Sequence, residues 1–490
     1  MLFYIALAFI LFLVHQFWWR RRGLPPGPLP LPLIGNLHQF TLAKRWEDKF
    51  VEFKNRFGPI YTLYMGPVPV VTVNDYETCV KLFVNEPDTY SDRPTVEHFN
   101  LLTRGGTRGI VQSNGSHWLA QRRTALRILR DFGLGKNQMQ ERILDEVQTV
   151  CDILNKEIGE GIRDHNVNQY TDISVGSVIN SLICGYRFTK NDKSDEFEHL
   201  KYWSNQFIRQ FTNPLTNIGV NNAFLARMPL IRTKMLQFKE VFDQLFSFVD
   251  RVIKDHKAKN DYENDEFEPV DFVDAYMLEM YKARRTGNDE YFSEEECRNI
   301  VLDLWLAGQE STSTTLQWAF AYLVLNPDKQ AKIHAELDRE IGSDRLILVA
   351  DRPKLVYLNA AINEVQRCAN LAVFNAPHAL AKDVTVNGYH LKKRTVIFPQ
   401  ISAIMMDPKN FPDPHKFQPE RFIDSKGQLS NIEKLIPFEG LARMELLLFM
   451  ANLLNQYKFL PGRQPPTAER VVNGGTALCK PYTCQLEKRF

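Results

Sequence analysis

A carboxyl group and several hydroxyl groups interrupt an otherwise apolar stretch in the middle of the chain, Val301–Pro327. The stretch has no breaker before Pro327 and no consistently polar face, so it predicts a long helix surrounded by protein. At its centre residues 307–312 read AGQEST. Gly308 costs a helix interior about 1 kcal/mol relative to alanine, and a buried acid needs a partner, so the pattern favours a bulky group lying against this groove. A core helix whose hydroxyls bond back to the preceding turn is an equal alternative.

Two further segments place polar groups at helical spacing. Residues 118–130 predict a helix with Trp118 and Arg122 on one face, and a second face is basic and carries Arg123, Arg127 and Arg130. Such a run is ordinarily a solvated surface. Residues 355–369 repeat apolar side chains at i, i+3, i+4 and i+7, with Glu364 and Arg367 spaced for an ion pair.

The N-terminus predicts a membrane anchor. Leu2–Trp19 is apolar apart from two residues, and its length of about 18 residues is just sufficient to span a bilayer. Arg20–Arg22 follow immediately. Positive charge after the apolar run favours an uncleaved anchor with a cytosolic body over a signal peptide. The proline-rich stretch that follows predicts a stiff spacer. We therefore expect an anchor with a basic stop over 1–22, a hinge over 23–35 and a single domain over 36–490.

The remaining chain is mainly helical in pattern with short strands, so the expected fold class is mainly α with small β-sheets (α+β). Hairpins are predicted at residues 61–73 and 384–391, the second with Asn387-Gly388 as its turn. The charge-rich residues 254–296 predict a mobile surface connection. A net charge of +2 over 490 residues gives no case for nucleic acid binding. The seven cysteines form no C-x-x-C pair and are expected to be reduced thiols.

Several separated motifs occur together in the order typical of one family. They are the proline run of Leu24–Gly35, Trp118-x-x-x-Arg122, Ala307-Gly308-x-Glu310-Ser311, Glu364-x-x-Arg367, and Phe417-x-Pro419-Glu420-Arg421-Phe422. In this combination, which covers nearly the whole chain, the sequence resembles the microsomal cytochrome P-450 family of the animal drug-metabolism type. The resemblance implies the cytochrome P-450 fold, a heme held between the long helix and a proximal loop, and anchorage in the endoplasmic reticulum membrane. It also implies insertion of one oxygen atom from O2 into a lipophilic small molecule, with electrons from NADPH delivered by a flavoprotein reductase.

The resemblance also implies roles for particular residues. Glu310 and Ser311 resemble the acid–alcohol pair that passes protons to iron-bound oxygen, with serine where threonine is usual. Glu364, Arg367 and Arg421 resemble a structural salt-bridge triad. The residues expected to pair with the heme propionates are Arg108, Trp118, Arg122 and His378. The basic face of Arg123, Arg127 and Arg130 becomes a candidate docking surface for the reductase, and Phe99 and the Gly105-Gly106 loop are candidates for substrate contact.

The sequence departs from the family at the axial ligand. The family carries a loop of the form F-x-x-G-x-R-x-C-x-G, whose cysteine thiolate binds the iron. Here Pro437-Phe438 joins directly to Glu439-Gly440, and the segment with the cysteine is missing. Neither Cys368, Cys479 nor Cys484 follows at a usable spacing, and Met444 is expected to pack in the core. We therefore predict no metal ligand and doubtful heme binding.

Two hypotheses follow from this departure. The chain is a heme-dependent monooxygenase whose sequence here is a splice form or gene model without the loop, or it is an impaired member that binds apolar ligands or occupies the reductase. A structural membrane protein without a cofactor pocket explains the motif set less well.

Overall fold

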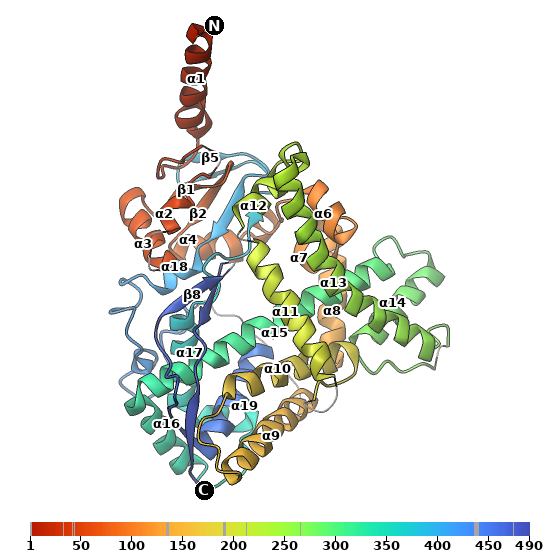
Figure 1. Cartoon of the computed structure of the whole chain (residues 1–490), viewed down its shortest axis with the longest axis vertical. Helices are drawn as coiled ribbons and strands as arrows, with labels where there is room; N and C mark the ends of the chain where they lie inside the picture. Colours follow the sequence, from red (N-terminus) through yellow and green to blue (C-terminus); the bar gives the residue numbers. More distant parts are fainter. Residues whose placement is uncertain are drawn as a thin grey trace.

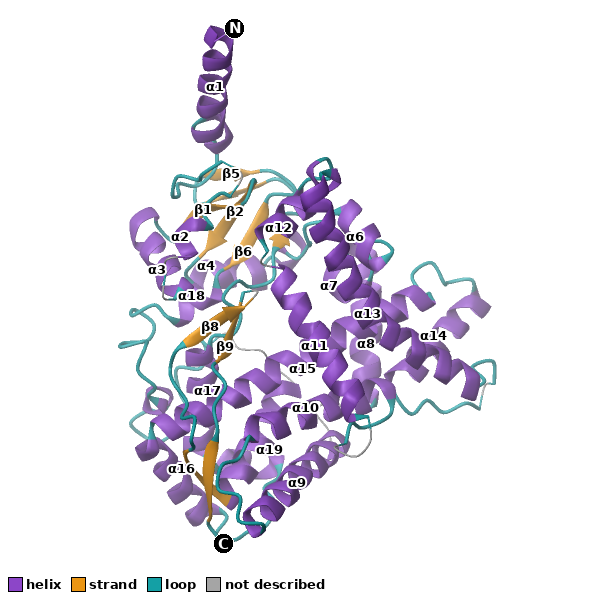
Figure 2. Ribbon diagram, viewed as in Figure 1, coloured by secondary structure: helices purple, strands orange, loops and turns teal. Residues whose placement is uncertain are grey.

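The computed structural model describes residues 2–32, 34–41, 43, 45–133, 137–189, 193–211, 213–264, 266–435, 441–473 and 475–490. Helices dominate, and small sheets lie along one side of the molecule (Figure 2). The expected fold class, mainly α with small sheets, is confirmed. The α-helices are α1 Leu2–Phe17, α2 His38–Thr41, α3 Trp46–Phe57, α4 Tyr76–Cys79, α5 Pro87–Tyr90, α6 Glu97–Arg104, α7 Gly109–Gln112, α8 Gly115–Asp131, α9 Asn137–Gly159, α10 Val167–Cys184, α11 Ser194–Phe211, α12 Pro214–Asn221, α13 Pro229–Lys259, α14 Phe272–Thr286, α15 Glu294–Leu325, α16 Pro327–Glu340, α17 Val356–Ala369, α18 Ile401–Met405 and α19 Leu441–Gln456.

The strands form four small sheets in the described part of the chain. The largest has the order β1-β2-β6-β3, in which β2 runs parallel to β6 and the other neighbours are antiparallel. The strands are β1 Ile60–Met65, β2 Val68–Val73, β3 His378–Ala379, β4 Val384–Val386, β5 Tyr389–Leu391, β6 Val396–Pro399, β7 Tyr457–Pro461, β8 Arg470–Asn473, β9 Thr476–Cys479 and β10 Cys484–Lys488. Both predicted hairpins are confirmed, as β1–β2 and β4–β5. Asn387 and Gly388 both have positive φ, as this turn requires.

The long helix α15 crosses the middle of the molecule, between α10 and α17 (Figure 1). It begins at Glu294, before the expected start, because the side chain of Ser293 caps it by accepting a hydrogen bond from the amide of Glu296. Trp305 and Trp318 are almost completely buried along its length. The prediction of a helix surrounded by protein is confirmed.

The proline-rich stretch lies against the edge of the largest sheet. The amide of Thr62 in β1 donates to the carbonyl of Pro26 at 2.9 Å, and a Cβ on Gly27 would overlap the carbonyl of Thr62. Glycine is therefore required at this close approach. The stretch covers the open edge of β1 in addition to leading toward α1.

At the N-terminus α1 projects away from the body (Figure 1). A short 3-10 turn, Trp19–Arg21, follows it. Among the described residues we find no helix with the length and apolar character needed to cross a bilayer. The anchor over 1–22 is not confirmed and stays a prediction.

The expectation of a mobile surface connection over residues 254–296 is wrong. This segment contains the end of α13, the whole of α14 and the start of α15. In α14 Phe272, Val273, Tyr276, Met277 and Met280 are fully buried. Their spacing of one, three and four residues forms an apolar stripe that the surrounding charges concealed.

Candidate active site

A cavity of about 160 Å³ lies between α15, α17, α18 and α19. Ser311 and Thr315 reach it from α15, and Ala442 and Leu446 reach it from α19. The other lining residues are Gln366, Leu371, Ala372, Asn375, Ile401 and Met405. The cavity therefore presents hydroxyl and amide groups on an otherwise apolar wall.

Two hydroxyls on α15 bond back to the helix itself. Ser311 Oγ donates to the carbonyl of Ala307 at 2.7 Å, and Thr315 Oγ1 donates to the carbonyl of Ser311 at 2.7 Å. At Gly308 the groove is filled by the chain, because an added Cβ would come within 2.6 Å of Ile179 Cδ1 from α10. Both interpretations of AGQEST thus hold in part: Ser311 bonds back, and the bulky neighbour of Gly308 is a side chain.

Glu310 does not line this cavity and instead meets a lysine from another helix. Lys201 Nζ of α11 lies 2.9 Å from Glu310 Oε1 and 3.0 Å from Asp172 Oδ1 of α10. Burial raises the pKa of Glu310, and the charge of Lys201 opposes that rise. The two carboxylates in turn raise the pKa of Lys201 against the effect of its burial. Sequence reasoning missed Lys201 and Asp172, because no local pattern links them to α15.

The predicted triad residues lie together in the core. Arg367 Nε is 2.7 Å from Glu364 Oε2, and Arg421 Nε is 3.0 Å from Glu364 Oε1. Arg367 also donates to the carbonyl of Met405 at 3.0 Å. Glu364 and Arg367 are fully buried, so their charges neutralise one another away from water.

The four residues expected near propionates have different partners. Arg108 pairs with Glu296 at the start of α15, at 3.0 Å. Arg122 lies over the ring of Trp118, 5.5 Å from its centroid, so these two share a face of α8 as expected. His378 Nε2 lies 3.3 Å from Arg93.

Arg93 joins His378 and Arg122 in an electropositive group. Burial and the charge of Arg93 lower the pKa of His378 to about 4. Burial and the charge of Arg122 lower the pKa of Arg93. An anionic group would relieve this repulsion. Arg93 was missed because it stands alone in a loop without helical or strand periodicity.

The basic face on α8 is partly neutralised. Arg127 pairs with Glu279 of α14 at 2.6 Å. Arg130 Nε donates to the carbonyl of Leu126 at 3.0 Å, and Arg123 is exposed. Arg123 and Arg130 therefore carry most of the positive charge that this face offers to a partner.

The donor set does not fit a heme with a thiolate ligand. All seven cysteines lie in the described part of the chain, and none of them lines the cavity beside Ser311. Burial raises the pKa of every one of these thiols. For Cys368 burial and Glu364 raise it to about 12, and its sulfur accepts a hydrogen bond from Arg367. Met444 packs against the main core, as expected, and the Phe438–Glu439 junction lies outside the described residues.

The structure combines a long buried helix with hydroxyls at a cavity, a buried Glu–Arg–Arg cluster and small sheets on one side. The family model "Cytochrome P450" matches residues 25–486, so the chain belongs to this family. It is 31% identical to "Cytochrome P450 2B19" of Mus musculus, over 98% of this chain and 97% of the relative. It is 32% identical to "Cytochrome P450 2A9" of Mesocricetus auratus, over 92% and 91% of the two chains. "Cytochrome P450 2H1" of Gallus gallus is also 32% identical, over 94% and 92%.

Membership of this family supports, in general terms, a heme monooxygenase function. The family also implies electrons from a flavoprotein reductase and lipophilic substrates. The chain therefore belongs to this family, and none of its seven cysteines lines the cavity beside Ser311.

Proposed function

We propose that this chain keeps the body of a monooxygenase but, with this sequence, does not carry out thiolate-dependent oxygen insertion. One observation supports the proposal: no cysteine stands between Pro437 and Met444, and none lines the cavity between α15 and α19. In this family the thiolate pushes electron density onto the iron and favours O–O cleavage. A chain without it has lost the group on which the chemistry depends, and is left as an apolar-ligand binder or a scaffold for the reductase.

A second candidate is a working monooxygenase that inserts one oxygen atom from O2 into a lipophilic small molecule. The retained triad of Glu364, Arg367 and Arg421 favours it, as does the hydroxyl of Ser311 at the cavity wall. This candidate requires a form of the chain that contains the missing loop.

A reduced carbon-monoxide difference spectrum separates the two candidates. The unaltered full-length chain is expected to give no red-shifted Soret band, because that band requires thiolate ligation. A variant with the residues x-x-G-x-R-x-C-x-G inserted after Phe438, which completes the F-x-x-G-x-R-x-C-x-G segment, is expected to give it. A band from the unaltered chain would refute the proposed loss. A restored chain without the band would show that the body itself no longer accepts heme.

In a loop-restored chain we propose Glu310 and Ser311 as the pair that moves protons toward the cavity. Ser311 Oγ donates to the carbonyl of Ala307, so it must rotate before it can donate into the cavity. Serine lacks the methyl group that restricts threonine, which makes this rotation easier. Lys201 pairs with Glu310, which does not line the cavity, and its charge favours the carboxylate form of Glu310.

We propose that the reductase docks on the basic face of Arg123, Arg127 and Arg130. Acidic groups of the reductase would be attracted to this face, and salt would weaken the attraction. Arg123→Glu is expected to weaken binding of a flavoprotein reductase at low salt and to reduce its salt dependence. Arg232→Glu is the matched control, because Arg232 is an exposed arginine on α13, outside this face. Equal effects of both substitutions, or none from Arg123→Glu, would contradict this surface.

We also propose that α1 attaches the protein to the endoplasmic reticulum membrane, with 36–490 folding as one domain in the cytosol. Large apolar side chains of α1, including Phe3, Leu11 and Phe12, are exposed. Such a surface is more stable in contact with lipid than with water. The full chain is expected to stay with membranes in alkaline carbonate, and a chain lacking residues 2–22 is expected to be released. Release of both would contradict this attachment.

A further inference from the structure

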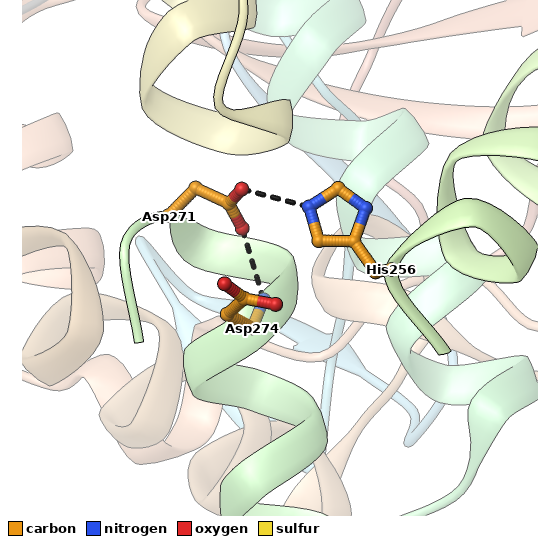
Figure 3. A group of neighbouring side chains, drawn as sticks. All are labelled: His256, Asp271 and Asp274. Atoms are coloured by element: carbon orange, nitrogen blue, oxygen red, sulfur yellow. Dashed lines mark hydrogen bonds and ion pairs between the residues drawn. The ribbon is translucent and has the colours of Figure 1, made fainter. Parts of the chain in front are cut away.

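Three potential metal ligands converge where α13 ends and α14 begins, at a cavity remote from the candidate active site. They are His256, Asp271 and Asp274, which offer ligand atoms within 4.8 Å of one another (Figure 3). The adjoining cavity has a volume of about 630 Å³ and shares no lining residue with the cavity beside Ser311. Neither the family resemblance nor the proposed function gives these residues a role.

The imidazole of His256 is oriented as in a metal site. His256 Nδ1 lies 2.8 Å from the carbonyl of Val252, which can only accept, so Nδ1 carries a proton and donates it. Nε2 therefore faces Asp271 Oδ2, at 2.7 Å. Histidines that bind metals usually have their second nitrogen fixed in this way by a carbonyl or carboxylate. Either a proton or a cation can lie between Nε2 and the aspartate.

The two carboxylates are likewise positioned by neighbouring donors. Asp274 Oδ1 accepts hydrogen bonds from Tyr262 and Asn260, both at 2.7 Å. Its Oδ2 receives only a 3.4 Å contact from the amide of Val270, so this oxygen retains lone pairs for a ligand. Asp271 Oδ1 caps α14 through the amide of Asp274 and leaves Oδ2 for His256.

A cation can replace the positive charge that now faces the two carboxylates. Asp271 and Asp274 are each 1% exposed, so their negative charges need a counter-charge. His256 pairs with Asp271 at 2.7 Å, and the charge of Arg142 also acts on Asp271. A divalent cation bound by a neutral His256 would supply the counter-charge in place of the imidazolium.

The adjoining cavity leaves room for water as a further ligand. Its volume is about 630 Å³, and His256, Asp271 and Asp274 are among its lining residues. An imidazole nitrogen, two carboxylate oxygens and a water suit Zn²⁺, which often keeps three protein ligands and one open position.

We infer that His256, Asp271 and Asp274 form a zinc site that links the end of α13 to the start of α14, with water from the adjoining cavity completing the coordination. Zinc takes the place of the proton on His256 Nε2. The inference does not depend on the heme chemistry, and it gives the charge-rich segment after α13 a structural role.

The test uses the untagged full-length chain in detergent, titrated with Zn²⁺ against a chromophoric chelator. One zinc per chain is expected, with a raised unfolding temperature. His256→Gln is expected to weaken zinc binding about 10-fold or more. His165→Gln is the matched control, because His165 forms a similar pair with Glu157, at 2.8 Å, outside the cluster. No stoichiometric zinc, or equal loss in both variants, would overturn the inference.

X-ray absorption of the zinc-loaded, unaltered chain gives a second measurement that does not need a variant to fold. Nitrogen and oxygen neighbours at about 2.0 Å, and no sulfur at about 2.3 Å, are expected. The spectrum of Cys184→Ser is expected to be the same. A shell that contains sulfur would place the zinc at a cysteine and overturn the assignment.

Discussion

Lys201 of α11 and Glu310 of α15 form an ion pair in the interior, with Nζ 2.9 Å from Oε1. Asp172 of α10 lies 3.0 Å from the same ammonium group, so one lysine joins three helices. The pair sits one residue from Ser311, which faces the candidate active site. A side chain from α11 thus sets the charge next to the cavity.

Removing the ammonium group should destabilise the fold strongly. Lys201→Met leaves Glu310 and Asp172 buried without their cation, which typically costs about 3–5 kcal/mol. Urea unfolding of the variant and of the unaltered chain measures this loss of unfolding free energy. Lys239→Met is the control, because Lys239 forms an exposed i,i+4 pair with Asp243 and its loss should cost at most about 0.5 kcal/mol.

A double variant separates the charge effect from lost packing. Adding Glu310→Gln to Lys201→Met removes one of the two stranded carboxylates, so the double variant should be more stable than Lys201→Met alone. A double variant that is less stable, by the sum of the single losses, would show that the two side chains do not interact.

Glu364 should be among the least replaceable charged residues in the chain. Its oxygens contact Arg367 at 2.7 Å and Arg421 at 3.0 Å, and Glu364→Gln leaves two guanidinium groups without a counter-charge. A loss of about 3–5 kcal/mol in unfolding free energy is expected. Glu52→Gln, on an exposed i,i+3 pair with Lys49, should change it by less than about 1 kcal/mol. Similar values for the two variants would contradict the triad's structural role.

Sequence reasoning succeeded where the contact lies within one element. Glu364 and Arg367 are neighbours because a helix brings residues three apart together, and α15 was recognisable from its apolar length. Sequence reasoning could not find Lys201 or Arg93. Lys201 contacts Glu310, and Arg93 contacts His378, only after distant segments pack together. Sequence reasoning also indicated that Gly308 has a close neighbour, but not that this neighbour is Ile179.

The same limit applies to the charge-rich segment. Charged residues between apolar ones obscured the stripe that buries Phe272, Tyr276 and Met280 in α14. The cluster of His256, Asp271 and Asp274 was therefore invisible, because its members come from the end of one helix and the start of the next. Burial, which the sequence does not display, decides whether such charges are solvated or paired.

Glu445 of α19 should make stability fall as pH rises. Burial raises the pKa of this carboxyl to about 8, from 4.5, with a hydrogen bond to Thr312 acting in the opposite direction. Between these two values the folded state holds a proton that the unfolded state releases. Unfolding free energy should therefore drop by up to about 1.4 kcal/mol per pH unit across that window.

Glu445→Gln should remove this component of the slope while keeping a hydrogen-bonding group of the same shape. Urea unfolding at several pH values between 5 and 8, for both proteins, measures the difference. Parallel pH profiles for the two proteins would show that Glu445 titrates normally in the folded state.

The contact between Gly308 and Ile179 can be tested by adding one methyl group. A Cβ at position 308 would come within 2.6 Å of Ile179 Cδ1, in a core where that side chain is buried. Overpacking of this kind costs about 1–3 kcal/mol, and the better helix propensity of alanine returns about 1 kcal/mol. Gly308→Ala should therefore lower the unfolding free energy. Gly159→Ala is the matched control, since Gly159 ends α9 with open space around its Cα, and it should not be destabilising.

Ile179→Val identifies the neighbour responsible. Alone it removes a buried methyl group and should cost about 0.5–1.5 kcal/mol. Combined with Gly308→Ala it deletes Cδ1, the nearer clashing atom, and leaves Cγ1 at 2.8 Å. The clash is relieved in part, so the double variant should be more stable than the sum of the single losses predicts. If the losses of the two single variants simply add, the Cβ at position 308 does not contact Ile179. The groove would then be open to a bound group, as the sequence alone first suggested.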